Sequence, residues 1–205
     1  MQAEDLLRTA TVIPVLTIER VDDAVPLARA LAAGGLRVLE VTLRTASGLE
    51  AIARIAAEVP EAIVGAGTVT AAEEFTAIRG AGARFAVSPG YSAVLEAAAG
   101  DMPWLPGVAT ASEMMAARAA GRRALKFFPA EVAGGIPALK AFAGPFGDLL
   151  FCPTGGIGQA NAGDYLALPN VACVGGSWVA PAQAIDSGDW GRIETLAAEA
   201  AALGR

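Results

Sequence analysis

Eight short apolar runs, separated by helix-like stretches, are the feature that most constrains the fold of this 205-residue chain. The runs are continuous rather than alternating, which is typical of strands buried on both faces of a sheet. Glycine or proline turn signals mark the seven boundaries between them, as at Gly34-Gly35 and Gly144-Pro145. The runs cover residues 12–18, 38–43, 63–66, 85–87, 104–108, 124–128, 149–152 and 171–174.

The stretches between the runs have helical periodicity. Leu49, Ile52 and Ile55, for example, fall on one face of a helix. Eight successive strand-then-helix units predict a single α/β domain over residues 1–205, folded as a closed parallel (β/α)8 TIM barrel near the lower size limit of that fold. An open, doubly wound parallel sheet is the alternative, because two of the units could be misassigned.

Composition excludes several classes of function. The formal net charge of −6 argues against nonspecific nucleic-acid binding. Apolar residues make up 54% of the chain and charged residues 18%, so we expect some helix faces to be buried between subunits. The polar, acidic start at residues 1–5 does not resemble a secretion signal, and the charge-free stretch 165–185 is broken by prolines and paired glycines. We therefore expect no membrane contact and a cytoplasmic location.

The chain has no histidine and only two lysines, Lys126 and Lys140. Without histidine or a cysteine cluster, neither a metal nor another cofactor is expected. Lys126 lies inside an apolar run, where its charged form would lose hydration and part of the amine would be free to act as a nucleophile. Such an amine is what Schiff-base catalysis on a carbonyl substrate requires. The alternative is a packed aliphatic stem whose ammonium group reaches solvent.

In a barrel of this kind, reactive side chains lie in the strands and at their carboxyl ends. Glu40, in the second run, is either a general acid/base held in a dry cavity or a structural ion-pair partner of Lys126 or Arg37. Arg44 follows that run, so it is placed to bind a carboxylate, although it could be an ordinary surface arginine. Thr68 follows the third run and is either a ligand for a carboxylate or carbonyl oxygen or the cap of the next helix.

Paired glycines follow the last two runs. Gly155-Gly156 and Gly175-Gly176 would let backbone amides approach an anion closely, with a helix N-terminus nearby. The loops after strands seven and eight are a recurrent phosphate site in such barrels. The pairs could instead only relieve crowding in tight turns, but their occurrence in both units favours phosphate.

Six segments together resemble the 2-keto-3-deoxy-6-phosphogluconate (KDPG) and 4-hydroxy-2-oxoglutarate (KHG) aldolase family, in order along nearly the whole chain. They are VLEVTLRT (38–45), VGAGTV (64–69), SPG (88–90), KFFPAE (126–131), FCPTGGI (151–157) and GGSW (175–178). The resemblance implies a metal-free class I aldolase of the Entner–Doudoroff pathway that forms a homotrimer. It also implies cleavage of KDPG to pyruvate and glyceraldehyde 3-phosphate, with KHG as a second substrate.

The resemblance assigns roles to individual residues. Lys126 would be the Schiff-base lysine and Glu40 the proton-transfer residue, while Arg44 and Thr68 would hold the pyruvate carboxylate. The sugar chain and phosphate would contact Thr154, Gly155, Gly156 and Ser177. Other functions stay open: an aldolase for the galactonate-derived epimer, an isomerase-type barrel that transfers protons only, and a noncatalytic binding barrel.

Overall fold

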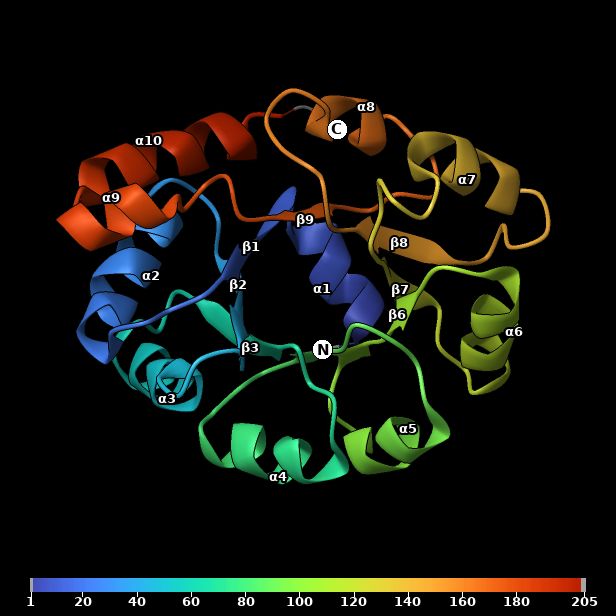
Figure 1. Ribbon diagram of the computed structural model, residues 1–205, viewed down its shortest axis with the longest axis horizontal. Coiled ribbons are helices and arrows are strands. Elements are labelled where there is room, and N and C mark those ends of the chain that lie inside the picture. The colour runs from blue at the N-terminus through green and yellow to red at the C-terminus, as the bar shows by residue number, and fades with distance from the viewer. Residues whose placement is uncertain (1, 204–205) are drawn as a thin grey trace.

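Parallel strands lie side by side around a central axis, with helices outside them (Figure 1). This is a computed structural model that describes residues 2–203. Within these residues the strands are β1 (Val12–Leu16), β2 (Val38–Thr42), β3 (Ile63–Gly67), β4 (Ala86–Val87), β5 (Trp104–Leu105), β6 (Gly107–Val108), β7 (Ala124–Phe127), β8 (Leu150–Pro153) and β9 (Val174–Gly176).

The strands form two parallel sheets. One has six strands in the order β5-β4-β3-β2-β1-β9, and the other has three in the order β6-β7-β8. Isolated parallel bridges join Phe151 to Val171 and Thr154 to Gly175, at the junction between the two sheets. The α/β class and the parallel pairing are confirmed, but the strands do not form one continuous eight-stranded ladder.

Two of the predicted runs differ from the observed strands. Run 104–108 is divided into β5 and β6 at Pro106, which has no N–H to donate although its carbonyl accepts from the Lys126 amide at 2.9 Å. Run 171–174 contributes only Val174 to β9, which continues through Gly175-Gly176. Each of the other six runs contains one strand, with ends shifted by no more than two residues.

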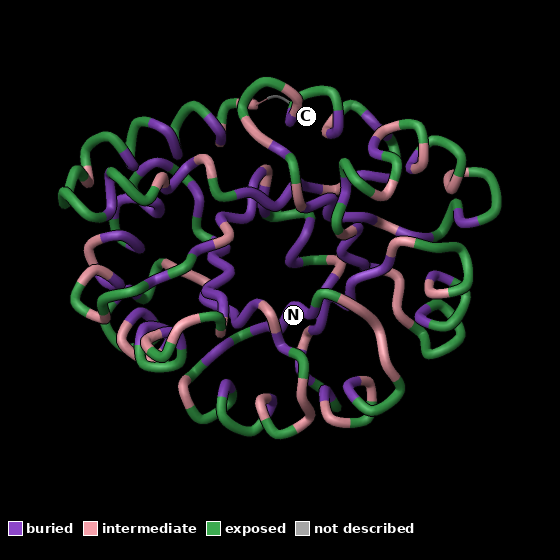
Figure 2. The backbone as a smooth tube through the Cα atoms, viewed as in Figure 1, coloured by how far each residue is buried: buried purple, intermediate pink, exposed green. Residues whose placement is uncertain are grey.

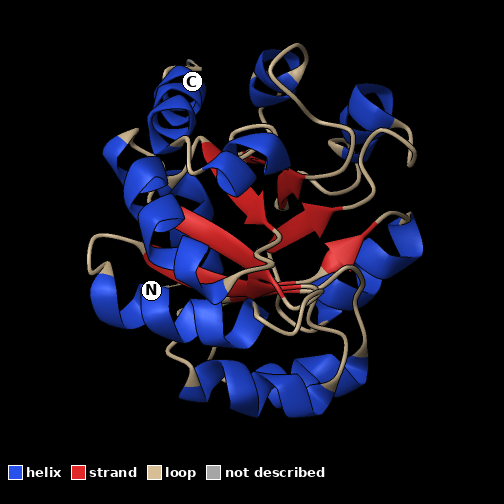
Figure 3. Cartoon of the chain, turned by 60° about the vertical axis from the view of Figure 1, so that its left-hand side comes forward, coloured by secondary structure: helices blue, strands red, loops and turns tan. Residues whose placement is uncertain are grey.

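Apart from the first helix, which precedes the first strand, the helices follow strands along the chain and cover their outer side (Figure 3). Local capping fixes several of their starts: in α6, the Thr110 hydroxyl accepts from the Glu113 amide while the Glu113 carboxylate accepts from the Thr110 amide. A short 3-10 turn, Val21–Asp23, precedes the second helix. The α-helices are α1 (Ala3–Thr9), α2 (Ala24–Ala33), α3 (Gly48–Glu58), α4 (Ala72–Gly80), α5 (Ala93–Ala99), α6 (Ala111–Ala119), α7 (Gly135–Phe142), α8 (Ala162–Leu166), α9 (Ala182–Ser187) and α10 (Trp190–Ala201).

The apolar core has two parts. The larger fills the space between strands and outer helices. The smaller lies among the amino ends of the strands and includes Leu6 and Leu7 of α1 together with Phe85 and Leu105. Figure 2 shows buried backbone along the central strands and exposed backbone on the outer turns. Because α1 covers the amino ends, the opposite, carboxyl ends are left to carry a site. None of the helices within residues 2–203 is long and apolar enough to cross a membrane.

Candidate active site

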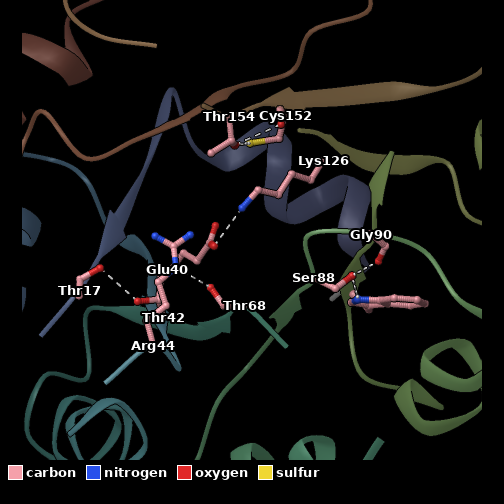
Figure 4. Close-up of polar contacts among 11 residues, drawn as sticks. Thr17, Glu40, Thr42, Arg44, Thr68, Ser88, Gly90, Lys126, Cys152 and Thr154 are labelled. Atoms are coloured by element: carbon pink, nitrogen blue, oxygen red, sulfur yellow. Dashed lines mark hydrogen bonds and ion pairs between the residues drawn. The ribbon is translucent and has the colours of Figure 1, made fainter. Parts of the chain in front are cut away.

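The side chains of Lys126 and Glu40 are in contact in the space enclosed by the strands, although the two residues come from different sheets. Lys126 on β7 donates from Nζ to Oε1 of Glu40 on β2 at 3.1 Å, and the two residues are 5% and 3% exposed (Figure 4). The ammonium therefore does not reach solvent, and Glu40 pairs with Lys126 rather than with the exposed Arg37. Burying both charges has a large desolvation cost, so the pair is a weak contribution to stability and a candidate for function.

The glycine-rich sequence of β3 makes room for this pair. Gly67 lies beside Thr42 of β2, and a methyl group on its Cα would overlap Oε1 of Glu40. Gly65, in register with Glu40, likewise has no space for a side chain because the Phe85 ring lies against it. The two glycines allow a carboxylate and an aromatic ring to pack against the strand backbone.

Arg44 and Thr68 lie together at the carboxyl ends of β2 and β3. Arg44 donates from Nε to the Thr68 hydroxyl at 3.2 Å (Figure 4). Thr68 does not cap the following helix, because Glu74 accepts from the Thr70 and Ala71 amides there. Thr68 has a φ of 63°, a backbone conformation that β-branched residues seldom adopt and that is concentrated at functional sites. An arginine beside a hydroxyl is a suitable pair for a carboxylate ligand.

A cavity of about 230 Å³ opens at the carboxyl ends of the strands. Five of the residues predicted to bind a phosphorylated sugar chain line this cavity, together with Arg44, which is predicted to bind a carboxylate. The lining residues that the sequence analysis predicted as site residues are Arg44, Thr154, Gly155, Gly156, Gly176 and Ser177. Gly175 is not among the lining residues; it leaves room for Thr154, whose hydroxyl would overlap a methyl group at that position.

The loop after β8 has the backbone form that its glycines allow. Gly155 and Gly156 have φ values of 100° and 80°, which other residues rarely adopt. Successive positive φ angles can turn backbone amides toward one concave surface, and such surfaces bind anions. The loop thus combines accessible amides with the Thr154 hydroxyl close by.

Four further residues line this cavity and were not predicted: Val15, Thr17, Phe128 and Ile157. Thr17 shares a hydrogen bond of 3.3 Å with the buried Thr42 hydroxyl, where either oxygen can donate. Its signal in the sequence was weak, because one threonine within run 12–18 is ordinary for a strand. Among residues 2–203, no cluster of three or more histidine, cysteine or acidic side chains is placed to hold a metal.

Comparisons with known proteins agree with this geometry. The family model described as "KDPG and KHG aldolase" matches residues 3–196. The 2-dehydro-3-deoxy-phosphogluconate aldolase of Dickeya dadantii is 55% identical over 98% of this chain and 95% of its own.

Two solved structures are also similar over almost the full length. The KDPG aldolase of Legionella pneumophila, with pyruvate captured at low pH as a covalent carbinolamine intermediate, has a TM-score of 0.96 and 46% identity, covering 98% of this chain and 99% of that one. The corresponding enzyme of Zymomonas mobilis with 3-phosphoglycerate has a TM-score of 0.94 and 49% identity, covering 99% and 96%.

Proposed function

Because the chain belongs to the KDPG and KHG aldolase family, we propose that it cleaves KDPG to pyruvate and glyceraldehyde 3-phosphate by class I, Schiff-base chemistry. The protein is a carbon–carbon lyase. The observation that carries the mechanism is the buried contact between Lys126 and Glu40, beside a cavity that has Arg44 at one end and the glycine loop at the other. The carbinolamine captured in the Legionella enzyme supports a covalent amine intermediate.

Lys126 is the nucleophile in this proposal. Its proton passes to Glu40, and the free amine adds to the C2 ketone to give a carbinolamine. Glu40 then returns a proton as water leaves, which forms the iminium. The iminium accepts the electron pair of the C3–C4 bond as the C4 hydroxyl loses its proton to Glu40, directly or through a water. The aldehyde departs, and the enamine is protonated at C3 and hydrolysed to pyruvate and free Lys126.

The two ends of the substrate are held by different groups. Arg44 and Thr68 bind the carboxylate next to the ketone, which places C2 near Nζ of Lys126. The phosphate and the hydroxylated chain contact a second group of residues, whose backbone amides and side-chain hydroxyls act as hydrogen-bond donors. This group consists of Thr154, Gly155, Gly156, Gly176 and Ser177, with Gly175 supporting Thr154. The 3-phosphoglycerate in the Zymomonas enzyme supports a phosphorylated ligand.

The larger architecture belongs to the same proposal. The first and last strands, β1 and β9, are hydrogen-bonded neighbours, which supports a single closed (β/α)8 barrel over residues 1–205. Residues 1, 204 and 205 lie outside the part of the chain that the structure describes. We propose a homotrimer acting in the Entner–Doudoroff pathway. The family description favours KHG as a second substrate, cleaved to pyruvate and glyoxylate by the same steps.

Borohydride trapping tests the proposal directly. Treatment with pyruvate and borohydride should add one pyruvate-derived group per chain, and peptide mapping should locate it at Lys126. Lys126→Arg should abolish trapping and lower KDPG turnover by several orders of magnitude, because a guanidinium keeps its proton. Lys140→Arg is the matched control, since Lys140 is exposed on α7, and should behave as wild type. A label on Lys140, or an active Lys126→Arg enzyme, would refute the Schiff-base mechanism.

No step of this mechanism uses a divalent ion. KDPG cleavage should therefore keep its full rate after prolonged dialysis against EDTA, as measured by coupling aldehyde release to a dehydrogenase. A loss of activity that Zn²⁺ or Mg²⁺ restores would contradict the class I assignment.

A further inference from the structure

The segment that follows the Lys126 strand is bonded to the glycine loop. The Ala130 amide donates to the Thr154 carbonyl at 2.8 Å, and the Glu131 amide donates to the Gly155 carbonyl at 3.1 Å. These bonds extend the pairing of β7 with β8 beyond the ends of both strands. The position of the loop is therefore tied to the strand that carries the nucleophile.

The Glu131 side chain supports the loop from one side. A Cβ built on Gly156 would lie 2.5 Å from Cγ of Glu131, so the loop backbone packs directly on this side chain. Its carboxylate accepts a hydrogen bond from the hydroxyl of Tyr165, a fully buried residue of α8. Burial and the neighbouring Glu131 carboxylate both raise the pKa of the Tyr165 hydroxyl, so it stays protonated and remains a donor.

Asn161 holds the loop from the α8 side. Its side-chain oxygen accepts from the Gly158 amide at 2.9 Å, and its side-chain nitrogen donates to the Gly156 carbonyl at 3.1 Å. Asn161 is the N-cap residue of α8, and Tyr165 lies about one turn further along the same helix. The loop is therefore enclosed between Glu131 on one side and Asn161 on the other.

We propose that Glu131, Asn161 and Tyr165 are positioning residues that keep the Gly155–Gly158 loop in its anion-binding form and so set the affinity for the phosphorylated end of the substrate. The inference rests on the proposed function. A loop with three glycines in four positions has many competing conformations, and ordering it on binding would weaken affinity. Holding it beforehand removes that loss.

The test compares two tyrosine variants with the same chemical change. Tyr165→Phe removes the hydrogen bond to Glu131. Tyr91→Phe removes the hydroxyl of a ring in another part of the sequence, which stacks on Trp104. For Tyr165→Phe we expect the KM for KDPG to rise about fivefold to tenfold, with kcat within about twofold of wild type, because one hydrogen bond contributes about 1 kcal/mol. Tyr91→Phe should leave both constants unchanged.

A second readout isolates the phosphate end. Exchange of the pyruvate methyl hydrogens in heavy water requires the imine and proton transfer but no phosphate, so Tyr165→Phe should exchange at the wild-type rate. Asn161→Ala should reproduce the KM effect independently, which keeps the proposal testable if Tyr165→Phe does not fold. Glu131→Gln, which still offers an acceptor to Tyr165, should be closer to wild type than Glu131→Ala.

An unchanged KM for KDPG in both Tyr165→Phe and Asn161→Ala would overturn the positioning role. A loss of pyruvate exchange equal to the loss of KDPG affinity would also overturn it, because the residues would then act on the whole fold. These results are distinct from failure of the proposed function. In that case wild-type protein itself would not be trapped by pyruvate and borohydride at Lys126.

Discussion

At the scale of single residues, the missing side chain of Gly67 matters as much as the acid it faces. Gly67→Ala would place a methyl group where the Glu40 carboxylate lies, so the carboxylate must shift from the position in which it contacts Lys126. We expect turnover of KDPG to fall by about 10²-fold, the size of effect caused by displacing a catalytic group by about 1 Å. Steady-state kinetics and borohydride trapping measure the loss.

Gly163→Ala is the control for that change. Gly163 lies in α8 with open space around its Cα, so the extra methyl group should leave activity unchanged and should stabilise the helix slightly. Equal turnover in Gly67→Ala and wild type would show that Glu40 does not need its observed position.

Residue chemistry made part of the site predictable from the sequence. Lys126 and Glu40 could be selected as candidates because charged residues are rare inside apolar runs, and the structure places the two in contact. The capping alternative for Thr68 was excluded only by the structure, since capping by Glu74 depends on where α4 begins. Thr17 was missed because a threonine at the end of a predicted strand carries no distinctive signal until its neighbours in space are known.

At the scale of elements, the continuous apolar runs predicted where strands lie but not how they divide. Pro106 interrupts a strand because proline lacks a backbone N–H, and this is visible in the sequence. That β5 and β6 then belong to different sheets depends on which strands pair with each, which the sequence does not show. Helix α1 has no place in a pattern of eight strand-then-helix units. Its function as a cover follows from tertiary packing, which short amphipathic segments do not reveal.

The packing of α1 is testable by stability measurements. Leu7 is fully buried against the amino ends of the strands, so Leu7→Ala should lower the free energy of unfolding by about 2–4 kcal/mol. Leu49, which is 38% exposed on α3, provides the matched control, and Leu49→Ala should cost clearly less. Urea denaturation followed by circular dichroism measures both. Equal losses would mean that α1 contributes no more than a surface contact.

At the scale of the whole molecule, apolar surface remains uncovered on the single chain. Val94, Met115 and Val132 are 67%, 63% and 88% exposed, which agrees with the high apolar content of the sequence. We expect association to cover part of this surface, and a homotrimer to be the state in solution. Light scattering at micromolar concentration should give three times the chain mass of 20.6 kDa. A monomeric mass would refute the trimer.

Helix α1 packs over the amino ends of the strands, and the cavity of about 230 Å³ opens at their carboxyl ends. A substrate bound as proposed would therefore enter and leave at the carboxyl ends, with its phosphorylated half at the glycine loop. In the proposed mechanism, pyruvate stays bound to Lys126 after the C3–C4 bond breaks, so we expect its release to follow that of the aldehyde. We therefore expect the two products to leave in a fixed order, the phosphorylated aldehyde first and the keto acid second.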